Sequence, residues 1–385
     1  MIEEILRKAV ALSASDIHLK VGSHPVIRIE GKLVPMTGEK RLAQEDTIGM
    51  AFGIMSARQK QKFKEHLELD LAYSVPGLGR FRVNAFQQRG TVGLVVRAIP
   101  ITIPTTKALN LPPILERISQ ERRGLILVTG TTGSGKSTTL ASMIDFINSN
   151  RTEHIMTIED PIEFLHRDKK SLVNQREVEV DTKTFCLALR SALRQDPDVI
   201  LVGEMRDYET IETALTAAET GHLVMSTLHT VDATETVNRI VSVFPPHQQK
   251  QIRIQLAAVL KAVISIRLVS TKDGEGRVPA VEIMRATAYI RDCIENKEKT
   301  KLIPAAIANG KSQYGMQTFD QSLFELLKQD LISYEEALRQ ASNPDDFKLK
   351  VDGIQSTSEM VTEAQEPSSS CDSGKADWPF EFGPG

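Results

Sequence analysis

Hydrophobic residues recur at two spacings in the N-terminal part of the chain. Residues 2–12 place Ile2, Ile5, Leu6 and Ala9 on one face, which is the spacing of an amphipathic helix. Shorter segments between glycines and prolines alternate apolar and polar residues, and this alternation predicts strands. Strands are expected at residues 16–20, 26–30, 32–35, 69–75, 79–87 and 92–98, and further helices at residues 43–55 and 57–66. The pattern predicts a small α+β domain.

Continuous apolar runs replace the alternating segments farther along the chain. Such short runs are typical of parallel strands that are buried on both faces. They occur at residues 125–128, 154–158, 198–202 and 222–227, and segments with helical spacing occur at 137–147, 207–219 and 233–243. This alternation predicts an α/β domain with a mostly parallel sheet. Between the two patterns, residues 100–104 begin and end with proline and predict an extended linker, either a hinge or an inert connector.

The stretch at residues 130–137 fits G-x-x-x-x-G-K-[ST], the phosphate loop of nucleotide-hydrolysing enzymes. It lies between an apolar run and a helical segment, where backbone N–H groups and the helix dipole receive phosphates. In such loops the lysine, here Lys136, reaches the β- and γ-phosphates, and the hydroxyl residue, here Ser137, holds Mg²⁺. The residues expected to bind the nucleotide are Thr131, Thr132, Gly133, Ser134, Gly135, Lys136, Ser137 and Thr138.

Carboxylates follow the next two apolar runs. Residues 159–163 read Glu-Asp-Pro-Ile-Glu, and Glu204 follows the run at 198–202. Ligands of open α/β sheets bind in the crevice beyond the carboxyl ends of the strands. The second arrangement is that of a Walker B element, whose carboxylate handles Mg²⁺ or the attacking water.

Two histidines, His222 and His229, bracket the fourth apolar run. In a nucleotide-binding sheet they are candidates for sensing the γ-phosphate or for bridging subunits. They make a poor zinc pair, because no third ligand is spaced nearby.

Arginines line one face of a predicted strand in the first domain. Arg80, Arg82 and Asn84 alternate with apolar residues, and Arg97 lies on the next strand. The pattern fits a solvated sheet face. It equally fits an arginine finger, which stabilises charge on a transferring phosphoryl group in a neighbouring subunit.

Composition and charge argue against a nucleic-acid-binding or membrane-spanning protein. The 385 residues are 41% hydrophobic and 25% charged, as in ordinary globular proteins, and the net charge of −3 implies no general attraction to nucleic acid or membranes. No apolar run approaches the roughly 18 residues that span a bilayer. The three cysteines, Cys186, Cys293 and Cys371, are far apart, so neither a disulfide framework nor a zinc knuckle is expected and a reducing cytosol fits.

Four stretches together resemble the signature boxes of the secretion ATPases, the ring-forming motors of type II and type IV secretion and of type IV pili. They are residues 130–139, 159–163, 196–207 and 218–230. Further similarity at residues 244–249, 280–284 and 315–318 favours the subgroup that drives pilus retraction and twitching motility over the longer assembly ATPases. The resemblance covers residues 1–349.

The resemblance implies a fold and a domain organisation. It implies a PAS-like α+β domain at residues 1–99, a linker or hinge at 100–111, and a RecA-like P-loop ATPase domain with a C-terminal helical part at 112–352. ATP would bind between the two domains. Residues 353–385 turn to Ser, Glu, Gly, Pro and Thr, which is typical of a disordered tail.

The resemblance also assigns roles at the site, with ATP and Mg²⁺ as the cofactors. Glu163 is the expected catalytic base and Glu204 the Walker B glutamate, although the two carboxylates could exchange roles. Ser137 and Glu204 would hold the metal ion. His222 and His229 fall on the family's histidine box, and Arg82 and Arg97 fall on arginines that reach the nucleotide. These side chains and Lys136 form the expected catalytic set.

The partners implied are five further copies in a homo-hexamer and an inner-membrane pilus platform protein, with a paralogous pilus ATPase as a further candidate. No nucleic acid and no direct membrane insertion are expected, so the protein would be cytoplasmic and peripheral to the inner membrane. Residues 288–296 are more acidic than the retraction motif of the family, and Thr131 stands where proline is usual. An accessory paralogue, an assembly or type II secretion ATPase, and a weakly hydrolysing scaffold therefore remain alternatives.

Overall fold

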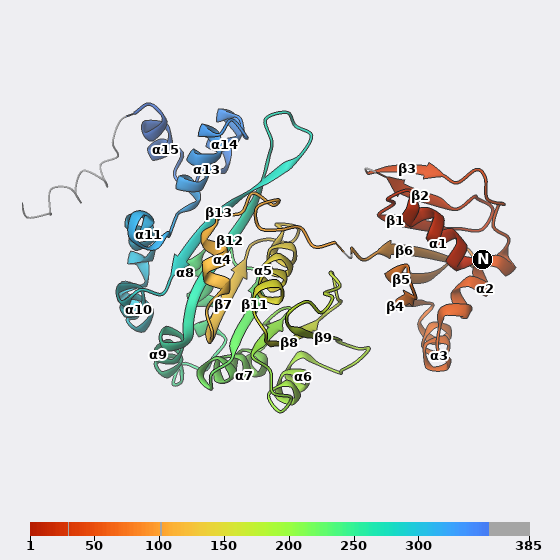
Figure 1. Cartoon of the computed structure of the whole chain (residues 1–385), viewed down its shortest axis with the longest axis horizontal. Coiled ribbons are helices and arrows are strands. Elements are labelled where there is room, and N and C mark those ends of the chain that lie inside the picture. Colours follow the sequence, from red (N-terminus) through yellow and green to blue (C-terminus); the bar gives the residue numbers. More distant parts are fainter. Residues whose placement is uncertain (30, 101, 354–385) are drawn as a thin grey trace, which may run out of the picture.

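The computed structural model describes residues 1–29, 31–100 and 102–353, and these residues form two separate β-sheets (Figure 1). A six-stranded sheet precedes residue 101, and a seven-stranded sheet follows it. The tail predicted at residues 353–385 lies, from residue 354 onward, outside the described residues.

The N-terminal sheet is antiparallel throughout, in the order β3-β2-β1-β6-β5-β4. Its strands are β1 (Asp16–Leu19), β2 (Val26–Ile29), β3 (Lys32–Pro35), β4 (Glu68–Val75), β5 (Gly79–Gln88) and β6 (Thr91–Ala98), and its helices are α1 (Ile2–Ala11), α2 (Gln44–Ile54) and α3 (Ala57–His66). The helical face predicted at the N-terminus is buried, since Ile5, Leu6 and Ala9 of α1 pack into the core of this sheet. The predicted α+β character of this region is confirmed.

The alternation predicted for the arginine-bearing strand is also confirmed. Phe81, Val83 and Ala85 of β5 are buried in the core, while Arg80 and Arg82 lie on the other face. Arg82 pairs in register with Arg97 of β6, so two of the predicted arginines are cross-strand neighbours.

The second sheet is parallel except for one strand, in the order β13-β12-β7-β11-β10-β8-β9. Its strands are β7 (Gly124–Thr129), β8 (His154–Glu159), β9 (Leu172–Glu177), β10 (Val199–Val202), β11 (Leu223–Leu228), β12 (Leu260–Ser270) and β13 (Arg277–Arg285). Only β13 among them runs antiparallel to its neighbour. The mostly parallel sheet predicted from the strand–helix alternation is therefore confirmed.

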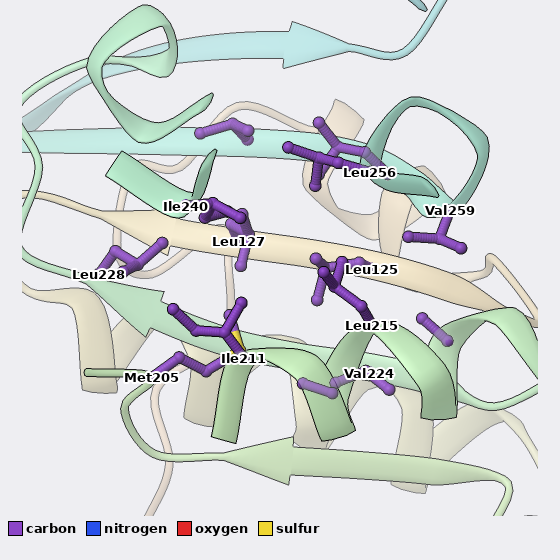
Figure 2. Close-up of a cluster of buried hydrophobic side chains, with 14 of the residues drawn as sticks. Leu125, Leu127, Met205, Ile211, Leu215, Val224, Leu228, Ile240, Leu256 and Val259 are labelled. Atoms are coloured by element: carbon purple, nitrogen blue, oxygen red, sulfur yellow. The ribbon is translucent and has the colours of Figure 1, made fainter. Parts of the chain in front are cut away.

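Helices cover both faces of this sheet. Its strands place apolar side chains on both faces, and these side chains are kept from water only where helices cover them. The helices are α4 (Ile114–Ser119), α5 (Lys136–Asn150), α6 (Phe185–Ala192), α7 (Tyr208–Glu219), α8 (Ala233–Ser242) and α9 (Gln249–Val259). Leu125 and Leu127 of β7 pack with α7, α8 and α9 (Figure 2), and Ile126 and Val128 pack with α4 and α5 on the other face.

A C-terminal group of helices completes the described chain. It comprises α10 (Ala288–Glu295), α11 (Ile303–Asn309), α12 (Lys311–Tyr314), α13 (Phe319–Lys328), α14 (Tyr334–Gln340) and α15 (Pro344–Val351). Phe319, Leu323 and Phe347 pack against Val269 and Val278 of the β12–β13 hairpin. No helix within residues 1–29, 31–100 and 102–353 has both the length and the apolar character needed to cross a membrane.

Several elements differ from the sequence pattern, and β9, α6, β12 and β13 have no counterpart among the predicted segments. Strand β9 reads Leu-Val-Asn-Gln-Arg-Glu, and this mostly polar strand at the sheet edge carries no apolar run that would predict it. Helix α6 is equally absent from the predicted elements. Helix α5 begins at Lys136, one residue before its predicted start, and β11 begins at Leu223, so that His222 precedes the strand.

Candidate active site

The phosphate loop, residues 130–137, connects the buried strand β7 to helix α5. Gly130 has φ 143°, and a Cβ there would lie 2.4 Å from the carbonyl oxygen of Ile266 on β12. Gly135 has φ 94° at the start of the helix. Both positions require glycine, because a side chain would clash at the first and strain the backbone at the second. The loop is thus fixed between two strands and a helix N-terminus.

Lys136 is buried at the base of this loop. Its Nζ donates hydrogen bonds to the carbonyl oxygens of Gly130 at 2.8 Å and Thr131 at 3.0 Å, and lies 3.4 Å from Nδ1 of His229. Burial lowers the pKa of Lys136, while the negative charges of Glu204 and Glu163 oppose this shift. Both carboxylates therefore lie close enough to the ammonium group to influence its pKa.

Glu204 follows β10, and hydrogen bonds to the neighbouring strands fix the position of the preceding residue, Gly203. Gly203 donates its N–H to the Ile158 carbonyl at 2.7 Å, and its own carbonyl accepts the Thr227 hydroxyl at 2.7 Å. The Glu204 carboxylate binds Nε2 of His229 at 3.0 Å and the guanidinium of Arg206. Burial alone would raise the pKa of Glu204, but Arg206 and His229 outweigh it and hold the pKa below its usual value. Glu204 is therefore ionised at neutral pH.

The acid box, residues 159–163, begins at the last residue of β8. Oε1 of Glu159 accepts hydrogen bonds from the Thr157 hydroxyl at 2.6 Å and from Nε2 of Gln175 at 3.1 Å. Burial raises the pKa of Glu159, and the charge of Glu163 raises it further. Glu163 itself is exposed to solvent. The two carboxylates therefore occupy different environments, and the solvated Glu163 is the one accessible to a water molecule.

These groups line one cavity of about 600 Å³ at the carboxyl edge of the sheet, the edge where the parallel strands end. The phosphate loop, the acid box, Glu204 and His229 all border it. Phe185, Leu268 and Arg277 contribute further walls. His166 also borders it, and burial lowers the pKa of this side chain to about 4, so its imidazole is neutral at pH 7.

His222 lies elsewhere. It precedes β11 whereas His229 follows it, so a strand of six residues, about 20 Å long, separates them. His222 borders a second cavity of about 220 Å³ at the opposite, amino edge of the sheet, together with Arg122, Arg151 and Asp198. Within one subunit the structure does not bring His222 to the phosphate loop.

Arg82 and Arg97 do not border the cavity of the phosphate loop either. Nε of Arg97 donates to Oδ1 of Asp16 at 2.8 Å, and Nε of Arg82 lies 3.8 Å from Oδ1 of Asp70. Both guanidinium groups are solvent-exposed, at 67% for Arg97 and 46% for Arg82. They remain available to a ligand approaching the face of the N-terminal sheet.

Several groups at the site were assigned no role from the sequence. Arg206 and Glu159 lie inside recognised boxes, but only the structure shows that Arg206 binds the Glu204 carboxylate and that burial raises the pKa of Glu159. Gln175 belongs to the unpredicted strand β9, and Arg277 to the β12–β13 hairpin. Arg277 stands at the start of its strand whereas Gln175 lies inside β9, and neither position carries a sequence signal that marks it as part of the site.

The oxygen ligands at the cavity suit a magnesium ion. Ser137, Asp160, Glu163 and Glu204 border it with hydroxyl and carboxylate oxygens, the donors that Mg²⁺ prefers. The described residues contain no cluster of three or more His, Cys, Asp or Glu side chains that would hold a metal alone. Mg²⁺ at nucleotide sites needs only one or two protein ligands besides the phosphates, so the donor set fits the ion.

Residues 80–340 match the family model of type II/IV secretion system proteins. The chain belongs to this family. A type IV pilus retraction ATPase, PilT of Pseudomonas aeruginosa, is 49% identical over 346 residues, which cover 90% of this chain and 99% of that protein. A second relative from the same organism, the type IV pilus ATPase PilU, is 42% identical and covers 91% of each chain.

A solved structure of a member of the family has the same architecture. The crystal structure of a pilus retraction motor, PilT with bound ADP, is 48% identical with a TM-score of 0.82, and the match covers 90% of this chain and 98% of that one. The expected RecA-like P-loop fold, preceded by a small α+β domain, is therefore confirmed, and so is membership of the secretion ATPases. The chain is accordingly an ATPase with a nucleotide-binding site.

Proposed function

We propose that this chain is the subunit of an ATP-hydrolysing motor that drives type IV pilus retraction. The observation that carries this proposal is the single cavity in which the phosphate loop, the acid box and the Glu204–His229 pair converge. Near full-length similarity to a pilus retraction ATPase supports the choice of pilus retraction over secretion.

The side chains divide the chemistry among them. Lys136 would turn from the loop carbonyls to the β- and γ-phosphates, and the backbone N–H groups of residues 131–138 would hold their oxygens. Glu163 would orient and deprotonate the attacking water, because it is the solvated carboxylate near Lys136. Glu204, ionised and held by His229 and Arg206, would help to position the metal ion together with Ser137. Bound Mg²⁺ would supply neutralisation of the phosphate charge.

We assign the nucleotide to the interface between an N-terminal domain at 1–99 and an ATPase domain at 112–352, joined by a hinge at 100–111. The arginine pair Arg82 and Arg97 would reach the phosphates from the N-terminal sheet, and His222 would act from the edge of a neighbouring subunit. Hydrolysis needs positioning and charge stabilisation more than covalent chemistry, so closing the two domains around ATP would switch the site on.

The working particle would be a homo-hexamer at the base of the pilus. The subunits would meet a platform protein of the inner membrane from the cytoplasmic side, and no nucleic acid would be bound. A paralogous pilus ATPase would be a further partner, since relatives of both kinds occur in one organism.

Steady-state ATP hydrolysis, with particle mass measured in parallel, tests the motor proposal. The wild-type protein should turn over ATP as a six-subunit particle, and Glu204→Ala should abolish turnover. Glu219→Ala, at the exposed last residue of helix α7, is the matched control and should remain active. Nucleotide binding without turnover, or a monomer under all conditions, would contradict the proposal.

Helix α10 favours one alternative, an accessory ATPase that works beside a main retraction motor. Asp292 and Asn296 of this segment replace other residue types of the retraction motif, and Asp292 pairs with Lys299 at 2.7 Å. Deletion decides between the roles. Deletion cells with surplus pili that no longer retract indicate the main motor. Cells whose pili retract with less force indicate the accessory role, and cells without pili indicate an assembly ATPase.

A further inference from the structure

The acid box is connected to the N-terminal sheet through one carboxylate. Oε2 of Glu177, the last residue of β9, accepts a hydrogen bond from Nη2 of Arg80 at 2.9 Å. The same oxygen accepts the backbone N–H of Ile162 at 3.2 Å. Ile162 immediately precedes Glu163. One oxygen atom therefore joins a strand of the N-terminal sheet to the peptide next to the proposed catalytic base.

A second connection runs parallel to the first. The carbonyl of Pro100, at the start of the linker, accepts the N–H of Leu165 at 3.4 Å, just beyond the acid box. The backbone of Arg80 also holds the linker, since its carbonyl accepts the N–H of Ile99 at 3.0 Å. Arg80 thus fixes the beginning of the linker with its backbone and the acid box with its side chain.

The Arg80–Glu177 pair is shielded from water. The side chains are 19% and 6% exposed, respectively. A neighbouring pair, Lys62 with Glu179, also joins the N-terminal sheet region to this loop, at 3.3 Å, but its side chains are 54% and 73% exposed. Exposed pairs contribute little because water and salt screen them, whereas breaking a buried pair leaves an uncompensated charge.

The geometry of Arg80 allows the contact to open. Its Nε is buried without a hydrogen-bond partner, so the guanidinium holds Glu177 by one nitrogen rather than by a two-pronged fork. A movement of the N-terminal sheet would break this single bond and remove the link between that sheet and the carboxylate that holds the Ile162 N–H.

We propose that Arg80 and Glu177 are positioning residues that make the location of Glu163 depend on the arrangement of the N-terminal sheet. The inference rests on the proposed hydrolytic function. A base must lie within hydrogen-bond reach of the water it activates, and a misplacement of about 1 Å can cost on the order of 100-fold in rate. Domain movement would therefore set the rate of hydrolysis without altering the phosphate loop.

The test compares Arg80→Ala and Glu177→Gln with the matched control Lys62→Ala. We expect each of the first two to lower kcat at least about tenfold while KM for ATP stays within about twofold, because Lys136 and the loop are untouched. The double variant should be no slower than the slower single variant, since both break one contact. Arg80→Lys should recover part of the rate, and Lys62→Ala should behave as wild type.

Hydrogen exchange provides a readout that does not need turnover. The amide of Ile162 should exchange faster in Arg80→Ala and Glu177→Gln than in Lys62→Ala, with the exchange of β7 unchanged. If the wild-type protein fails to hydrolyse ATP, the proposed function fails, while the exchange comparison still tests the connection. Equal kcat for Arg80→Ala and Lys62→Ala, independent effects in the double variant, or unchanged exchange at Ile162 would overturn the inference.

Discussion

The two ends of strand β11 carry the same residue type in different surroundings. His229, at the carboxyl edge of the sheet, lies between the carboxylate of Glu204 and the ammonium of Lys136. His222, at the amino edge, makes its Nδ1 contact with the carbonyl of Ala217 at 2.9 Å. The comparison shows that strand direction decides which polar residues meet: parallel strands gather their following loops at one edge.

The largest expected effect is a difference in kcat between carboxylate variants at the two edges of the sheet. Glu163→Gln and Glu204→Gln should each lower kcat by about 10²–10⁴-fold, since each removes a group that acts on the attacking water or the metal ion. Glu219→Gln, at the exposed end of helix α7 just before His222, should leave kcat within about twofold. Steady-state kinetics on the purified protein measure all three. A loss in Glu219→Gln as large as the others would remove the distinction between the edges.

Two glycines, one at each edge of the sheet, are expected to differ in how much an alanine substitution lowers the free energy of unfolding. Gly130→Ala places a Cβ 2.4 Å from a backbone oxygen, whereas Gly221→Ala, at φ 114°, meets nothing within 4 Å. The first should lower the free energy of unfolding by about 3 kcal/mol or more and abolish nucleotide binding, since clash and strain add. The second should cost about 1–2 kcal/mol of backbone strain only. Urea denaturation with and without ADP distinguishes them, and equal losses would contradict the expected clash.

The histidine pair gives a smaller, more specific difference. His229→Ala should lower kcat by about 10–100-fold, the equivalent of losing one or two hydrogen bonds to charged groups. His222→Ala should have a clearly smaller effect on kcat if it acts only from the edge of a neighbouring subunit. An equal or greater loss in His222→Ala would mean that the contact between subunits is as important for turnover as the pairing of Glu204.

The smallest expected effect concerns Glu282, a buried carboxyl of β13 whose oxygen accepts the Ala233 N–H at 2.8 Å. Burial raises its pKa from 4.5 to about 7, and Asp232 adds to the shift while Arg267 opposes it. A folded pKa above the unfolded one means that the native state holds the proton more tightly. Stability from this group is therefore present below pH 4.5 and declines as pH rises through 7.

Glu282→Gln should remove this decline. The free energy of unfolding of the wild type should fall relative to the variant by about 1 kcal/mol between pH 6 and pH 8. Thermal or urea unfolding at the two pH values measures the difference. A constant gap between wild type and variant would show that Glu282 does not titrate in this range.

Much of the fold and of the phosphate site could be predicted from the sequence. The apolar runs and the glycine-rich loop identify the parallel sheet and Lys136, because burial on both faces and phosphate binding each demand particular residue types. Membership of the secretion ATPases followed from the four boxes. The roles of the individual site residues are still predictions, which the variants above test.

The neighbours within the site could not be predicted, because they depend on strand order. The strands occur in the chain as β7, β8, β10, β11, but in space the order is β7-β11-β10-β8. Inserting β11 between β7 and β10 places His229 between the phosphate loop and Glu204. No spacing along the sequence encodes that insertion. Strand β9 escaped prediction because an edge strand keeps polar residues, and with it the link from Glu177 to Arg80.

Strand β9 is hydrogen-bonded to a neighbour on one side only. Edge elements with little buried apolar surface are the first to open in native proteins, with the central strands staying closed. Glu177, which supports the acid box, therefore lies on a strand that is expected to open early. The phosphate loop follows β7, a central strand that is expected to stay closed. With Glu163 as the proposed base, a subunit would release and rebuild the support of this carboxylate in each cycle while its nucleotide-binding core never unfolds.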